Sequence, residues 1–162
     1  MSLFNRRTLL FLSAAALGGC GFTPVYAPGG TGAALRGRVL VDAPEALDSY
    51  LLVQTLEDRL GRSSQPLYRL SVNLVLGEQG QALTQAGDIT RYSVVGLADY
   101  TLRVAGSGDV IASGRVENFT GYSATGSTAE TLASERDARA RLMTILADQI
   151  TTELYATAEL PG

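Results

Sequence analysis

Apolar and polar residues alternate along three segments in the middle of the chain. In the clearest of them, residues 68–76, every second residue is apolar and those between are mostly polar. Side chains of a strand point alternately to its two faces, so this period of two predicts a strand with one buried face. Gly77 and Gly80 follow the segment, and they predict a turn at its end.

The other two alternating segments, residues 92–104 and 110–122, predict a hairpin. The loop between them contains Gly106-Ser107-Gly108-Asp109, which suits a tight turn. In both segments, one set of alternate positions is largely apolar and the other is largely polar, which predicts an antiparallel sheet covered on one face only. The predicted uncovered face carries Arg91, Ser93, Asp99, Thr101, Arg103, Ser113, Arg115 and Glu117.

Two further segments repeat their apolar residues at steps of three and four, which is typical of a helix with one buried face. The first is residues 45–60, with Leu52, Leu56 and Leu60 on one side and Gly61 placed to end the helix. The second starts at Ser127, which has the spacing of a capping box with Glu130. Its apolar positions are Leu132, Leu142, Ile145, Leu146, Ile150 and Leu154.

The order of predicted elements defines the fold class. A short strand with Val39 and Val41 on one face precedes the first helix, and Pro44 ends that strand. The resulting order, β-α-β-β-β-α, predicts an α+β two-layer sandwich with a mostly antiparallel sheet and two helices on one face. We assign this domain to residues 38–158. Residues 20–37, rich in glycine, predict a flexible tether.

Composition removes several classes of function. The chain has 162 residues, no His and one Cys, which excludes His-dependent catalysis and Cys/His metal sites. A hydrolase with two carboxylates remains the enzymatic alternative, although no catalytic constellation emerges. We therefore expect no enzyme activity, metal or cofactor. All 13 basic residues are arginines against 16 acidic residues, and this net charge of -3 disfavours nucleic acid as a partner.

Residues 1–19 have the order of a secretory signal peptide: Arg6 and Arg7, then an apolar run, then small residues. The run is too short for a transmembrane helix. Leu17-Gly18-Gly19-Cys20 resembles a bacterial lipobox, which implies cleavage before Cys20 and lipidation of its thiol. The alternatives are that Cys20 is an ordinary residue near the cleavage site, and that the arginine pair directs twin-arginine rather than Sec export. Gly21 is not aspartate, which in Gram-negative lipoproteins implies sorting to the outer membrane.

The mature N-terminus carries the most specific motif. Residues 20–26 read Cys-Gly-Phe-Thr-Pro-Val-Tyr, and residues 146–150 read Leu-Ala-Asp-Gln-Ile in the last predicted helix. Both strings resemble the LptE family of lipopolysaccharide-assembly lipoproteins. This resemblance implies a lipid-anchored protein on the periplasmic face of the outer membrane. There it would plug the LptD β-barrel and help it assemble, while lipopolysaccharide passes to the outer leaflet.

The resemblance also implies lipopolysaccharide binding through basic residues around the sheet. Arginine binds phosphate bidentately, so the candidates here are Arg91, Arg103, Arg115 and Arg136. Each could equally be a solvated surface residue, and the loop at residues 84–88 has no cation. The rival function is a generic lipid-anchored binding or scaffold module for another envelope protein or lipid.

Overall fold

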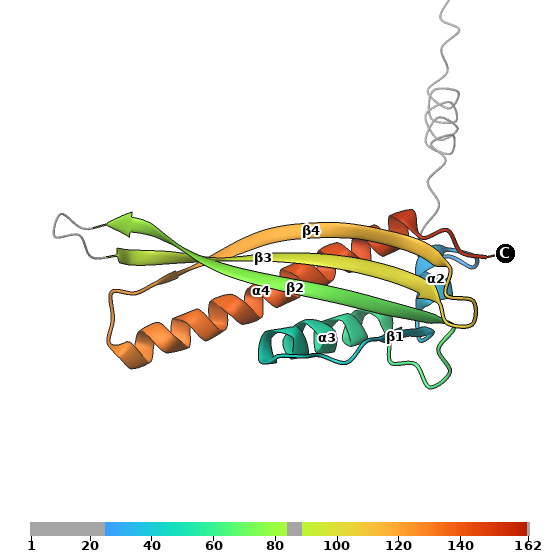
Figure 1. Ribbon diagram of the computed structural model, residues 1–162, viewed down its shortest axis with the longest axis horizontal. Coiled ribbons are helices and arrows are strands. Elements are labelled where there is room, and N and C mark those ends of the chain that lie inside the picture. Colours follow the sequence, from blue (N-terminus) through green and yellow to red (C-terminus); the bar gives the residue numbers. More distant parts are fainter. Residues whose placement is uncertain (1–24, 84–88, 162) are drawn as a thin grey trace, which may run out of the picture.

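The predicted order of strands and helices is present in the computed structural model, which describes residues 25–83 and 89–161. One short helix precedes the predicted elements. The elements are α2 (Thr31–Leu35), β1 (Val39–Val41), α3 (Leu47–Leu60), β2 (Tyr68–Leu83), β3 (Ile89–Val104), β4 (Val110–Ser123) and α4 (Thr128–Thr157). Figure 1 shows α3 and α4 on the same side of the sheet, which confirms the two-layer α+β sandwich.

The sheet has the strand order β1-β2-β3-β4. The long strands β2, β3 and β4 pair antiparallel, as predicted, whereas β1 pairs parallel to β2 and makes the sheet mixed. This orientation follows from the connection, because α3 carries the chain from the end of β1 back to the beginning of β2. Parallel strands require such a crossover.

The turn predicted at Gly77 and Gly80 is wrong, because both glycines lie inside β2. Gly77 pairs with Val95 and Gly80 pairs with Tyr92, so the ladder continues through both positions. Glycine weakens a strand locally, but the ladder with β3 satisfies its backbone groups and outweighs that preference. The register shifts only beyond Gly80, around Ala82.

The core lies between the sheet and the two long helices. Leu52, Leu56 and Leu60 of α3 are buried as predicted, and the capping box at the start of α4 is confirmed, with Glu130 Oε2 accepting from Ser127 N at 2.7 Å. Leu132 was predicted in the core but is 45% exposed. It lies in the first turns of α4, which diverge from the sheet in Figure 1. The fully buried residues of α4 are Ala138, Leu142, Met143, Leu146, Ala147, Ile150 and Leu154.

The prediction of a flexible tether is wrong for residues 31–37. They form α2 and the turn after it, and the Leu35 side chain is 0% exposed. Gly37 N donates to Leu60 O at 2.7 Å, and the Tyr26 ring packs edge-on against Tyr155 with centroids 5.6 Å apart. Leu35 and Tyr26 therefore dock this glycine-rich stretch onto the ends of the helices. Residues 20–24 of the predicted tether lie outside the described residues.

Candidate functional site

The face of the sheet opposite α3 and α4 is covered by no helix of the described residues and forms a candidate interaction surface (Figure 1). Alternation of side chains along the strands places on it the set predicted to be polar. Residues at its centre come into register across all three long strands. Asn73 of β2 pairs with Asp99 of β3, which in turn pairs with Arg115 of β4. We call the whole uncovered face the outer face, and this row forms its polar centre.

Arg115 is held by Asp99 through a bidentate ion pair. Its Nε lies 2.6 Å from Asp99 Oδ1 and its Nη2 lies 3.0 Å from Oδ2. The hydrogen bonds from the guanidinium lower the pKa of the Asp99 carboxyl, and the carboxylate raises the pKa of Arg115. Because this fork of donors already faces an anion, Arg115 has less capacity left for an external phosphate.

The four candidate arginines do not form one site. Arg91 and Arg103 lie near opposite ends of β3, which places them about 40 Å apart along the strand at about 3.3 Å per residue. Arg103 is exposed, and its Nη1 donates to Gly108 O at 3.2 Å. Arg136 is exposed on α4, in the other layer of the sandwich. Arg115 lies between Arg91 and Arg103 along the sheet.

A hollow of about 550 Å³ adjoins Arg91 at the far end of the outer face. Ser93 and Phe119 line it together with Gly121 and Ser123. The hollow therefore combines a cation, hydroxyl groups and an aromatic ring, which suits an amphipathic ligand.

The sequence did not reveal that Arg69 and Arg103 are direct neighbours. They pair across β2 and β3, so their side chains share the outer face at the end of the sheet nearest α2. Asp42 Oδ1 lies 3.6 Å from Arg69 Nη1 and offsets part of the charge. Only the register of two strands separated by a long stretch of chain brings these guanidinium groups together, so no local pattern could have found the pair.

The outer face, predicted to be largely polar, also carries an apolar patch. Val75 is 55% exposed and Phe119 is 66% exposed, with Val95 and Leu97 half-buried beside them. Val75 pairs with Leu97, and Val95 pairs with Phe119, so the four side chains are contiguous. An exposed apolar patch with polar surroundings is typical of a protein or lipid contact surface.

The charged row, the hollow beside Arg91 and the apolar patch suit recognition of a ligand or a partner protein. Within residues 25–83 and 89–161, no group of three or more His, Cys, Asp or Glu side chains could hold a metal ion. No helix in the same ranges is long and apolar enough to cross a membrane. Cys20, the predicted lipidation site, lies outside the described residues.

The fold is that of a class of bacterial lipoproteins. A putative lipoprotein from Caulobacter crescentus superposes with a TM-score of 0.65 at 24% identity, covering 79% of this chain and 95% of that one. Rare lipoprotein B from Shewanella oneidensis has a TM-score of 0.57 at 11% identity, with 74% and 93% covered. A minor lipoprotein from Acinetobacter baumannii has a TM-score of 0.56 at 16% identity, with 76% and 95% covered. No curated protein matches the sequence.

The family assignment rests on the sequence. The model of the LptE family, described as lipopolysaccharide-assembly, matches residues 38–154. That range extends from just before β1 almost to the end of α4. The chain therefore belongs to the LptE family, which is a family of non-enzymatic assembly lipoproteins.

Proposed function

We propose that this chain is a lipoprotein of the outer membrane, anchored through Cys20 on the periplasmic side, that plugs an LptD-like β-barrel and helps it assemble for lipopolysaccharide transport. The observation that carries the proposal is the family match, which covers nearly the whole folded domain. The lipobox at residues 17–20 supplies the anchor, and more than one acyl chain gives stable membrane attachment.

The two surfaces of the domain suit a plug. The interior of such barrels is polar, so a domain held there needs a mostly polar exterior around its own core. The outer face supplies charged and hydroxyl side chains, and the contiguous patch at Val75 and Phe119 supplies an apolar contact. The covered face gives the rigidity that a plug requires, because most of its core side chains are buried against the helices.

Two of the four candidate arginines are proposed as contacts for lipopolysaccharide phosphates. Arg103 lies beside Arg69, and Arg91 borders the hollow at the other end of the sheet. Arg115 is engaged by Asp99, and Arg136 lies on the helical layer, so we do not assign them this role.

Affinity purification of the tagged, lipidated protein from detergent-solubilised membranes tests the partner. We expect a large β-barrel protein to co-elute. A Cys20→Ala variant is the control, because it should fold normally but leave the membrane fraction. Recovery of unrelated envelope proteins, with no barrel, would overturn the proposal and favour a generic lipid-anchored module.

Lipopolysaccharide binding is tested separately with Arg69→Ala/Arg103→Ala and with Arg91→Ala. We expect each to weaken binding of purified lipopolysaccharide at least about tenfold, since one charge-assisted hydrogen bond contributes about 1.5–3 kcal/mol. Arg62→Ala is the matched control, because Arg62 is an exposed arginine that pairs with Glu57 near the end of α3. Unchanged affinity in both test variants would remove these residues from the lipopolysaccharide contact.

A further inference from the structure

Strand β2 has a long edge that no other strand covers. Its neighbour β1 is only three residues long and pairs with residues 68–70, whereas β2 continues to Leu83. Figure 1 shows β2 running well past the end of β1. Most of β2 is therefore an edge strand within the part of the chain that the structure describes.

The direction of the backbone groups along this edge follows from the pairing with β1. Tyr68 N donates to Arg38 O at 3.1 Å, and Leu70 O accepts from Asp42 N at 2.9 Å. Even-numbered residues of this part of β2 therefore direct their N–H and C=O groups away from β3. Beyond β1, no hydrogen bond among the described residues engages those groups of Val72, Leu74 and Leu76.

The opposite edge of the sheet, along β4, is protected in part. A side chain or the C-terminal segment occupies several of its outward backbone groups, which is how natural sheets prevent unwanted pairing. Glu159 N donates to Ile111 O at 2.9 Å, Phe119 N donates to Asn118 Oδ1 at 2.8 Å, and Arg141 Nη2 donates to Gly121 O at 3.4 Å. These contacts lie towards the ends of β4, whereas beyond β1 no contact among the described residues engages the edge of β2 from Val72 to Leu76.

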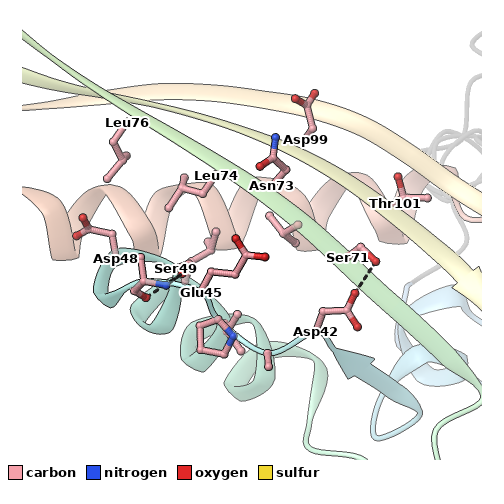
Figure 2. Close-up of a pocket in the computed structure, with 16 residues that line it drawn as sticks. Asp42, Glu45, Asp48, Ser49, Ser71, Asn73, Leu74, Leu76, Asp99 and Thr101 are labelled. Carbon is pink, nitrogen blue, oxygen red and sulfur yellow. Dashed lines mark hydrogen bonds between the residues drawn. The ribbon is translucent and has the colours of Figure 1, made fainter.

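A groove of about 560 Å³ runs beside the free edge, between β2 and the beginning of α3 (Figure 2). Apolar side chains from both elements line it. Leu74 and Leu76 extend toward the start of α3 in this view, and Leu52 and Val53 line the groove from the helix. The groove therefore offers apolar contacts to every second side chain of a strand added at this edge.

Acidic side chains surround the groove. Asp42, Glu45, Asp48 and Asp99 all line it, and no arginine does. Three of these carboxylates are paired with arginines: Arg139 Nη1 lies 3.2 Å from Asp48 Oδ2, Arg69 Nη1 lies 3.6 Å from Asp42 Oδ1, and Arg115 pairs with Asp99. Glu45 is exposed and forms no ion pair with the described residues. The remaining negative charge favours a cationic occupant.

We infer that the free edge of β2 binds an extended segment of a partner polypeptide in which apolar residues alternate with Arg or Lys. Main-chain hydrogen bonds to Val72, Leu74 and Leu76 would add the segment as a further strand. Its apolar side chains would enter the groove, and its basic side chains would face the carboxylates. A second copy of this chain fits poorly, because the acidic residues around its own groove would lie close to those of the first copy. The inference does not depend on the proposed barrel partner.

The test uses the full lipidated chain in detergent and a synthetic eight-residue peptide of alternating valine and arginine. Fluorescence anisotropy should show saturable binding, and a peptide of alternating valine and glutamate should not bind. Amide exchange measured by NMR should slow at Val72, Leu74 and Leu76. Ser71 and Asn73 should not change, since their amides already face β3.

Reversing the charge of one acidic residue that lines the groove tests its contribution to peptide binding. Glu45→Arg should weaken peptide binding about fivefold, since a partly exposed ion pair contributes up to about 1 kcal/mol. Asp58→Arg is the matched control, because Asp58 is an exposed acid of α3 that does not line the groove. Equal binding of both peptides, or slowed exchange along β4 in place of β2, would overturn the inference. Slowed exchange at β2 that depends on protein concentration, without peptide, would assign the edge to a second copy instead.

Discussion

The two faces of the sheet are built by the same three strands but have different roles. On the covered face, Leu70, Val94 and Leu102 are fully buried beneath the helices. On the outer face, the exposed side chains of Val75 and Phe119 lie among polar and charged residues such as Asn73, Asp99 and Glu117. Burial of apolar area is the main favourable contribution to folding, so the covered face stabilises the domain. The outer face contributes little to stability, and its side chains are available to a partner.

The largest expected effect is that of a charge placed in the covered layer. Leu146→Asp should unfold the domain, because Leu146 is 0% exposed and an unpaired buried charge costs several kcal/mol against a total stability of about 5–15 kcal/mol. Leu132→Asp on the same helix is the control, since its exposed side chain should leave the protein folded. Circular dichroism melting distinguishes them, and similar melting temperatures would contradict the difference between the two positions.

A methyl group added to each face gives a finer comparison. A Cβ at Gly96 would lie 2.9 Å from Leu146 Cδ1 and 3.1 Å from Leu142 Cδ2, so Gly96→Ala should cost about 1–3 kcal/mol. A Cβ at Gly77 would meet nothing within 4 Å, so Gly77→Ala should be neutral or stabilise the protein by up to about 1 kcal/mol. Urea denaturation measures the free energy of unfolding of both variants. A larger loss of stability in Gly77→Ala than in Gly96→Ala would contradict this difference between the two faces.

The smallest effect is expected from the ion pair on the outer face. Hydrogen bonds from Arg115 lower the pKa of Asp99, so the pair stabilises the fold above the ordinary Asp pKa of about 3.9. That contribution is lost as the pH falls through the lowered pKa. NMR titration should therefore find the Asp99 midpoint below 3.9, and Arg115→Ala should return it to the ordinary range. A midpoint that is the same in both proteins would show that the pair does not form in solution.

Stability should change little between pH 5 and 8. The chain contains no histidine, the side chain whose ordinary pKa falls in that interval. Melting temperatures measured across this range give a baseline. The loss of stability at lower pH, where Asp99 is protonated, is measured against that baseline.

The sequence by itself determined the elements whose signals are local. Alternation identified the three long strands, and steps of three and four residues identified α3 and α4. Ser127 with Glu130 marked the beginning of α4, and Gly61, with a φ of 79°, marked the end of α3. These signals depend on the period of one element or on the hydrogen bonds of one turn, so they are visible without any partner.

Only the tertiary structure decided which parts of those elements meet. The parallel placement of β1, the continuation of β2 through Gly77 and the burial of Leu35 all depend on contacts with distant segments. The same holds for the neighbouring positions of Arg69 and Arg103, and for the free edge of β2. Pairing register and side-chain burial are properties of two segments at once, and the periodicity of either segment alone does not contain them.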